Sequence, residues 1–103
     1  MNALILSLFL LLQRNEANVS WYECCNTHTA SGQRFNPDMQ GAAHKTLPFG
    51  TMVMFAYKGK YIVVPIIDRG PFIKGREFDL TRGSARKLGI LNKGVARVRT
   101  TIL

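Results

Sequence analysis

Short apolar stretches separated by turn residues make up most of the second half of the chain. Residues 51–57 and 61–68 are rich in Val, Ile, Phe and Tyr, and Lys58-Gly59-Lys60 separates them, which predicts two strands joined as a β-hairpin. Residues 63–67 contain no polar side chain, so we expect both faces of the second strand to be covered. Pro65 has no N–H to donate and therefore predicts an edge or a bulge at that point.

The remaining elements are one helix and two further strands. Asp79-Leu80-Thr81 opens a predicted helix, with Thr81 as its N-cap. Residues 84–88 tolerate helix, and Gly89 follows at the usual place of a C-terminal glycine. Residues 94–102 alternate between a basic side and an apolar side, and residues 19–22 are a short strand candidate. Residues 26–50 are rich in Thr, Ser, Gly, Asn and Pro and are expected to be mostly loop. Many short strands with one helix favour a mainly β fold, a small closed β-barrel.

The N-terminal segment has a different pattern. Residues 3–12 are apolar apart from Ser7, a length typical of the central region of an export signal. We therefore assign residues 1–18 to a signal peptide or hydrophobic leader and 19–103 to the barrel domain, and expect an exported protein of the periplasm or cell envelope. A short buried helix is the alternative for the apolar segment. No apolar run reaches 18 residues, so no transmembrane helix is expected.

The charge is strongly positive and unevenly distributed. The 103 residues contain 14 Lys and Arg against 6 Asp and Glu, a formal net charge of +8, and all of the excess lies after residue 26. This balance favours an anionic partner such as nucleic acid, anionic lipid or an acidic glycan.

Two neighbouring cysteines, Cys24 and Cys25, stand near His28. A disulfide between adjacent residues requires a strained ring, and a structural zinc site requires four ligands at other spacings. We interpret the cysteines as small apolar side chains and expect neither a metal nor a cofactor.

The strongest candidate for chemistry is Asp68. It directly follows an apolar strand, and the chain then turns at Gly70-Pro71. Strand ends and their loops commonly hold functional groups, and apolar neighbours favour the protonated carboxyl that a general acid needs, whereas Arg69 favours the ionised form. The alternative is an aspartate that only accepts backbone hydrogen bonds in the turn.

His44 is the second candidate. It follows Ala42-Ala43, which leave space above the backbone, and it precedes the turn Pro48-Phe49-Gly50. A solvated or locally hydrogen-bonded loop histidine is the alternative, and that interpretation holds more strongly for His28. Asp79 is interpreted as a charge that favours the N-terminus of the predicted helix.

At these segments the chain resembles rare-lipoprotein-A-like (RlpA-like) domains. The resemblance runs from about residue 19 to residue 103, and six ordered motifs carry it: Ser20-Trp21-Tyr22, then Thr29-Ala30-Ser31-Gly32-Gln33-Arg34-Phe35-Asn36, then Ala42-Ala43-His44-Lys45-Thr46-Leu47-Pro48-Phe49-Gly50-Thr51, then Asp68-Arg69-Gly70-Pro71-Phe72, then Gly75-Arg76 with Asp79-Leu80, and finally Gly94-Val95-Ala96-Arg97-Val98.

The resemblance implies a six-stranded double-psi β-barrel that acts as a lytic transglycosylase on peptidoglycan glycan strands, with preference for strands without stem peptides. It implies Asp68 as the acid and base and His44 as its assistant, through a hydrogen bond to Asp68 or to the sugar. Thr29 and Arg69 would line the cleft. No cofactor is implied, and a monomer is expected.

Two other classes of function compete with this one. A carbohydrate-binding or wall-loosening module of the expansin or barwin type would bind glycan through Trp21, Tyr22 and the basic face without cleaving it. Nucleic-acid binding is disfavoured, because Arg97 and Arg99 are not interleaved with the stacking aromatic side chains that single-strand platforms use.

Overall fold

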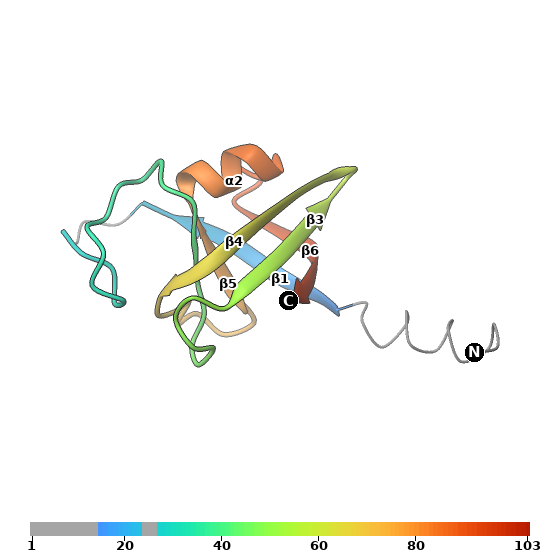
Figure 1. Cartoon of the computed structure of the whole chain (residues 1–103). Helices are drawn as coiled ribbons and strands as arrows, with labels where there is room; N and C mark the ends of the chain where they lie inside the picture. The colour runs from blue at the N-terminus through green and yellow to red at the C-terminus, as the bar shows by residue number, and fades with distance from the viewer. Residues whose placement is uncertain (1–14, 24–26) are drawn as a thin grey trace.

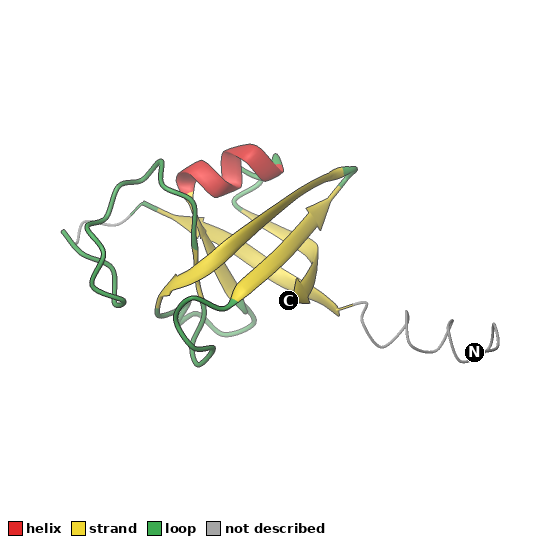
Figure 2. Cartoon of the chain, viewed as in Figure 1, coloured by secondary structure: helices red, strands yellow, loops and turns green. Residues whose placement is uncertain are grey.

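The computed structural model describes residues 15–23 and 27–103, which form six strands and one helix (Figures 1 and 2). The elements are β1 (Asn15–Tyr22), β2 (Ala42–Ala43), β3 (Met52–Tyr57), β4 (Lys60–Asp68), β5 (Phe78–Thr81), α2 (Arg82–Leu88) and β6 (Val95–Ile102). The strands close into a barrel in the order β1-β5-β2-β4-β3-β6. The predicted small β-barrel with one short helix is therefore confirmed.

The barrel combines parallel and antiparallel strand pairs. β1 pairs with β5 and β2 with β4 in parallel, and the other four neighbours pair antiparallel. Parallel neighbours bring residues far apart in the sequence together, because they need a long connection. Thus the end of β4 lies beside β2, which belongs to the predicted loop region.

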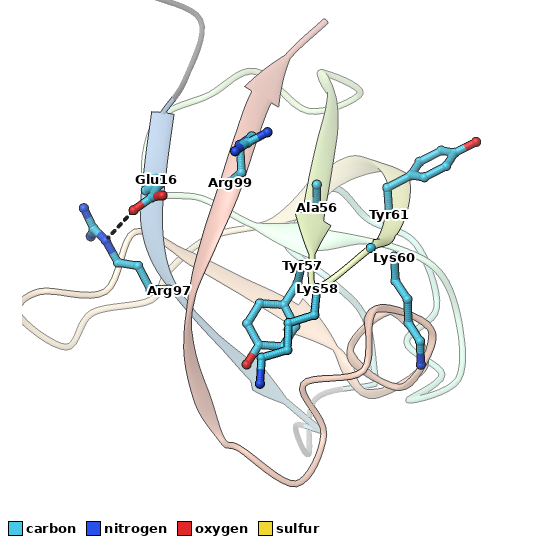
Figure 3. A pocket seen from close by; sticks show the side chains of 9 residues that line it. Glu16, Ala56, Tyr57, Lys58, Lys60, Tyr61, Arg97 and Arg99 are labelled. Carbon is cyan, nitrogen blue, oxygen red and sulfur yellow. Dashed lines mark ion pairs between the residues drawn. The ribbon is translucent and has the colours of Figure 1, made fainter. Parts of the chain in front are cut away.

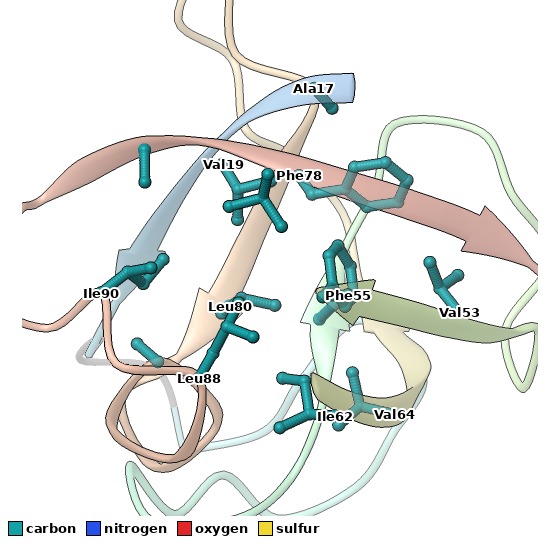
Figure 4. Close-up of a cluster of buried hydrophobic side chains, with 14 of the residues drawn as sticks. Ala17, Val19, Val53, Phe55, Ile62, Val64, Phe78, Leu80, Leu88 and Ile90 are labelled. Carbon is teal, nitrogen blue, oxygen red and sulfur yellow. The ribbon is translucent and has the colours of Figure 1, made fainter. Parts of the chain in front are cut away.

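Apolar side chains from all six strands fill the barrel, and Leu88 and Ile90 close it below α2 (Figure 4). On β4, Ile62, Val64 and Ile66 point into this core, whereas Val63 is 42% exposed. The prediction that both faces of this strand are covered is therefore wrong for its first half, where the outer face of the barrel meets solvent. Only Ile67 is buried on the outer side, against Gly41.

Pro65 does not lie on an open edge, because the barrel is closed. It pairs with Met52 at the start of β3, and the next residue, Ile66, already pairs with Ala42 of β2. The missing N–H thus falls where β4 passes from one partner strand to the other. The predicted irregularity does occur, two residues later at Ile67.

The local signals for the hairpin and the helix are confirmed. β3 and β4 pair through a turn at Lys58 and Gly59. The Thr81 side chain accepts a hydrogen bond from the Ser84 N–H, and Gly89 has the left-handed φ of 88° expected after a helix. The helix begins at Arg82, directly after the predicted N-cap Thr81.

The short strand β2 is held in place by α2 and its cap. The Gly41 N–H donates to Ser84 Oγ at 3.0 Å, and the Thr81 N–H donates to the Gly41 carbonyl at 3.0 Å. Thr81 Oγ1 also donates to the Met39 carbonyl. The helix therefore fixes the strand that precedes His44.

Two differences concern the boundaries of the strands. β1 begins at Asn15, four residues before the predicted strand and inside the segment assigned to the leader. β2 and β5 were not predicted as separate strands. The rest of the predicted leader, residues 1–14, and the pair Cys24 and Cys25 lie outside the described residues. Within the described ranges, no helix is long and apolar enough to cross a membrane.

Candidate active site

A β-bulge at the end of β4 sets the direction of Asp68. Ala42 pairs with Ile66 and Ala43 pairs with Asp68, so Ile67 is an extra residue opposite β2. Regular alternation from the buried Ile66 would turn Asp68 into the core. The extra residue instead places Asp68 on the outer face that Ala43 occupies, which is how bulges redirect side chains beside functional sites.

The bulge completes a row of four residues across neighbouring strands. Ala43 pairs with Asp68 of β4 on one side and with Asp79 of β5 on the other, and Asp79 in turn pairs with Ser20 of β1. We call Asp68, Ala43, Asp79 and Ser20 the carboxylate row. Strand spacing separates the two aspartate Cα atoms by roughly 10 Å. Between the two aspartates in this row lies only the methyl side chain of Ala43.

Three hydrogen-bond donors fix the Asp68 carboxyl group. Oδ1 accepts from the N–H of Ala30 at 2.9 Å and of Arg69 at 3.0 Å, and Oδ2 accepts from the Tyr22 hydroxyl at 3.1 Å. The backbone bonds are those of the turn-capping alternative. The Tyr22 bond comes from a strand on the far side of the row, so Asp68 is more than a turn cap.

His44 lies directly after β2, beside Asp68. Its backbone N–H donates to the Asp68 carbonyl at 3.2 Å, and Nδ1 accepts from the N–H groups of Thr46 and Leu47 at 3.1 and 3.0 Å. With Nδ1 acting as acceptor, the neutral ring carries its proton on Nε2. The structure shows no hydrogen bond between the His44 ring and the Asp68 carboxyl group; the contact between the two residues is through the backbone.

The surroundings of His44 favour its neutral form. Burial lowers the pKa of His44, and the positive charges of Arg69 and Lys45 act in the same direction, against Glu77. The ring packs against Phe78, with centroids 4.8 Å apart. His44 therefore presents a neutral Nε2–H donor at neutral pH.

Asp79 is a site residue that the sequence analysis missed. Burial raises its pKa, with a smaller contribution from Asp68, against the opposing effects of the Ser20 hydrogen bond and Arg76. Ser20 Oγ donates to Asp79 Oδ1 at 2.6 Å. The available signal was the alternation Phe78-Asp79-Leu80, a polar residue between two core residues, which marks an outward position on a strand.

The two aromatic candidates separate into different roles. Tyr22 joins the site through Asp68, and its ring stacks on Phe35 with centroids 5.6 Å apart. Trp21 packs against the core and donates Nε1–H to the Leu91 carbonyl at 3.1 Å. The structure therefore brings Tyr22 to the carboxylate row and holds Trp21 against the barrel interior.

Arg69 and Thr29 support loops beside the site. Arg69 Nη1 donates to the carbonyls of His44 and Leu47 at 3.1 and 2.7 Å, and the guanidinium lies 3.9 Å from the Phe49 ring centroid. Thr29 is only 5% exposed, and its hydroxyl bonds Ser31 at 2.9 Å. These contacts hold the loops that carry His44 and the Ala30 N–H.

A small hollow adjoins these loops. It has a volume of about 260 Å³ and is lined by Ser31, Gln33, Phe49, Gly50 and residues 65–67 of β4, next to Asp68 in the sequence. No group of His, Cys, Asp and Glu suited to a metal ion occurs among the residues that the structure describes.

The chain is similar to a known family and to named relatives. The family model described as "Lytic transglycolase" matches residues 14–100. The "Probable endolytic peptidoglycan transglycosylase RlpA" of Nostoc sp. is 52% identical over 77 residues, which cover 73% of this chain and 21% of that protein. The "Endolytic peptidoglycan transglycosylase RlpA" of Pasteurella multocida is 44% identical over 77 residues, covering 73% of this chain and 26% of that protein.

Solved structures support the fold. The Streptomyces papain inhibitor superposes with a TM-score of 0.73 at 22% identity, covering 88% of this chain and 94% of that one. The apo expansin of Clavibacter michiganensis gives 0.69 at 16% identity, covering 85% and 49%. Identities this low bear on the barrel alone.

The chain spans about a fifth to a quarter of the length of these two curated relatives. The match of the family model nevertheless covers almost all of the barrel, including the carboxylate row and His44. Together with the closed six-stranded barrel, it shows that this chain belongs to the lytic transglycolase family of double-psi β-barrel domains.

Proposed function

We propose that this domain is a lytic transglycosylase that cleaves the MurNAc–GlcNAc bond of peptidoglycan glycan strands and leaves 1,6-anhydroMurNAc ends. The observation that carries the proposal is the Asp68 carboxyl group, turned outward by the bulge and held by three donors beside His44. The family match and the RlpA relatives support the same reaction.

The reaction requires two proton transfers, one from Asp68 to the leaving group and one from the substrate back to Asp68. The Asp68 carboxyl group donates a proton to the glycosidic oxygen, the C1–O bond of MurNAc breaks, and GlcNAc leaves with a hydroxyl group. The C6 hydroxyl oxygen of the same MurNAc then bonds to C1, and its proton returns to Asp68. No water is consumed, so one carboxyl group serves as acid and then as base.

The neighbouring groups orient the sugar and spread the developing charge. The His44 Nε2–H is a neutral donor to a sugar oxygen, and because its pKa is lowered, it keeps that state below the usual histidine range. Asp79 retains its proton to higher pH than an ordinary aspartate, and it lies across Ala43 from Asp68. It therefore places a second carboxyl group in the carboxylate row, one strand away from Ala43 on the side opposite Asp68.

Digestion of purified glycan strands tests the proposal. We expect products that mass spectrometry identifies by the loss of one water relative to hydrolysed ends. Asp68→Asn keeps the shape of the side chain and is expected to reduce their release at least about 100-fold. Sacculus pull-down and far-UV circular dichroism provide the controls for binding and folding.

A binding module without turnover is the competing function, and the same assay separates the two. Wild-type protein that binds sacculi and releases no anhydro product would establish the binding module. Release of hydrolysed ends in place of anhydro ends would instead show that water attacks C1, and would contradict the proposed mechanism.

We also propose that the protein acts as a monomer in the periplasm or cell envelope, where its substrate lies. Cell fractionation and light scattering after size exclusion test these two statements. Recovery from the cytoplasmic fraction or a stable dimer would contradict them.

A further inference from the structure

A second hollow, larger than the one lined by Ser31 and Phe49, lies away from the carboxylate row. It is an open groove of about 540 Å³ on the outer faces of β1, β6, β3 and β4 (Figure 3). None of its lining residues belongs to the proposed catalytic site. β4 connects the two places: Lys60 lies at the groove and Asp68 at the row, roughly 26 Å away along the strand.

The groove is built on a second row of paired residues. Arg99 of β6 pairs with Glu16 of β1 and with Ala56 of β3, and Ala56 pairs with Tyr61 of β4. Arg99 and Tyr61 are exposed and form opposite walls, whereas Ala56 is too small to fill the space between them. We call Glu16, Arg99, Ala56 and Tyr61 the basic row, because its free charge is positive.

The charges in the groove leave cations available to a ligand. Glu16 pairs with Arg97, Oε2 to Nε, at 3.5 Å. Arg99 forms no ion pair with any carboxylate of the described residues, and Lys60 extends toward Gly89 at the end of α2. Arg99 and Lys58, which both line the groove, therefore remain as cations without an ion pair among the described residues.

Lys58 occupies a backbone position that a lysine rarely adopts. Its φ is 47°, and it is the only residue other than glycine with positive φ among the described residues. The hairpin turn favours Asn or Gly at this position, so lysine costs conformational energy there. Its Nζ lies 5.3 Å from the Tyr57 ring centroid, at the groove. Strained residues that place a polar group often serve a ligand.

We propose that this groove is a second glycan-binding site that takes an acidic glycan, with Arg99 and Lys58 binding its carboxylates and the exposed Tyr61 ring contacting the sugar. Arg and Lys side chains bind carboxylates through charge-assisted hydrogen bonds. This inference rests on the proposed function for the identity of the glycan. A peptidoglycan strand without stem peptides carries one lactyl carboxylate on each MurNAc, so it is a regular polyanion that this groove would hold while the row acts elsewhere on it.

Binding of end-labelled glycan strands tests the groove without cleavage. All proteins carry Asp68→Asn, and dissociation constants are measured by fluorescence anisotropy at low ionic strength. The probes are strands without stem peptides, the same strands with their carboxylates amidated, and polyphosphate. The test variant is Lys58→Gln with Arg99→Gln, and the matched control is Lys87→Gln with Lys93→Gln, which removes two exposed positive charges outside the groove.

We expect the groove variant to weaken binding of the carboxylate strands about fivefold and the control variant to change it less than twofold. Amidated strands should bind the parent and groove variant alike, and Tyr61→Ala should weaken both kinds of strand. If both double variants lost the same affinity for the strands, the effect would come from net charge alone, and the proposal would be overturned. Polyphosphate that binds more tightly than the strands, and depends on Arg99, would overturn the carboxylate assignment.

The result is independent of the proposed reaction. A wild-type protein that releases no anhydro product would contradict the transglycosylase proposal and leave these binding constants unchanged. Conversely, if the enzyme cleaves glycan strands but its groove variant binds them like the parent, the transglycosylase proposal stands and the second-site proposal is overturned.

Discussion

The carboxylate row and the basic row have the same construction and opposite chemistry. Each crosses four neighbouring strands, includes one residue of β4 and contains an alanine between larger side chains, Ala43 in one and Ala56 in the other. In the carboxylate row Ser20 and Ala43 are buried and both aspartates half-buried, whereas Glu16, Arg99 and Tyr61 in the basic row are exposed.

This difference in burial decides what each row can do. Burial raises the pKa of Asp79 and lowers that of His44, which prepares groups for proton transfer and neutral hydrogen bonding. Exposed cations keep their charge, are screened by salt and contribute little each. The half-buried carboxylate row is therefore suited to proton transfer, whereas the exposed basic row is suited to electrostatic binding.

The two alanines give the largest expected contrast. Ala43→Val would place a branched side chain between the two carboxyl groups, and we expect cleavage to fall at least about 100-fold, because small displacements of reacting groups are costly. Ala56→Val would only make the groove shallower and should weaken glycan binding about threefold with little change in cleavage of short fragments.

Thermal unfolding of both alanine variants is the necessary control. Ala43 is 2% exposed, and an added branch at a packed position costs about 1–3 kcal/mol. Activity is therefore compared at a temperature where circular dichroism shows both proteins folded. Equal losses of cleavage in the two variants would remove the functional distinction between the rows.

Asp79→Asn is expected to reduce cleavage about tenfold or more, because it removes the second carboxyl group while keeping the acceptor for Ser20. The same change should increase the free energy of unfolding relative to wild type at neutral pH. A raised pKa in the folded state contributes stability that is present below the unfolded value of 3.8 and is lost as pH rises through the folded pKa.

The measurement is the free energy of unfolding of wild type and variant across that pH range. We expect the variant to gain relative to wild type as pH rises from about 4 to neutrality. A difference that does not depend on pH would show that Asp79 titrates like an ordinary exposed carboxyl group and would weaken its assignment to the site.

Tyr22→Phe removes the hydroxyl donor to Asp68 Oδ2 and keeps the ring on Phe35. One hydrogen bond to an ionisable group corresponds to about a tenfold loss of cleavage. Tyr57→Phe, at the basic groove, is the matched control and should cleave like wild type. If Tyr57→Phe lost as much cleavage as Tyr22→Phe, the loss would not come from the hydrogen bond to Asp68, and the prediction would be wrong.

Much of the barrel was predictable because its signals are local. The β3–β4 hairpin, the Thr81 cap with Gly89 after the helix, and the alternation of Arg97 and Arg99 with buried neighbours in β6 each depend on a few adjacent residues. Asp68 and His44 were identified as neighbours through the resemblance, and the parallel β2–β4 pairing places their backbones in contact.

The remainder depends on pairings between distant segments. β2 has two residues and β5 has four, too few to show a strand pattern, and Asp79 was therefore interpreted as part of a helix start. The bulge at Ile67 and the Tyr22 bond to Asp68 exist only once β1, β2, β4 and β5 close around one another. Single-sequence patterns contain no information on such registers.

Lys58→Asn should produce the smallest effect and the most diagnostic one for the basic row. Asn tolerates the left-handed conformation that Lys58 adopts at φ 47°. The free energy of unfolding of the variant should therefore exceed that of wild type by about 0.5 kcal/mol. It also removes one cation from the groove and should weaken binding of acidic glycan strands about twofold. Denaturant unfolding and strand binding of the same protein are the two measurements.

A gain in stability together with a loss of binding would mean that lysine at this position destabilises the turn and that its charge contributes to glycan binding. Unchanged binding would leave Lys58 as a strained turn residue with no ligand and would confine glycan recognition to the carboxylate row.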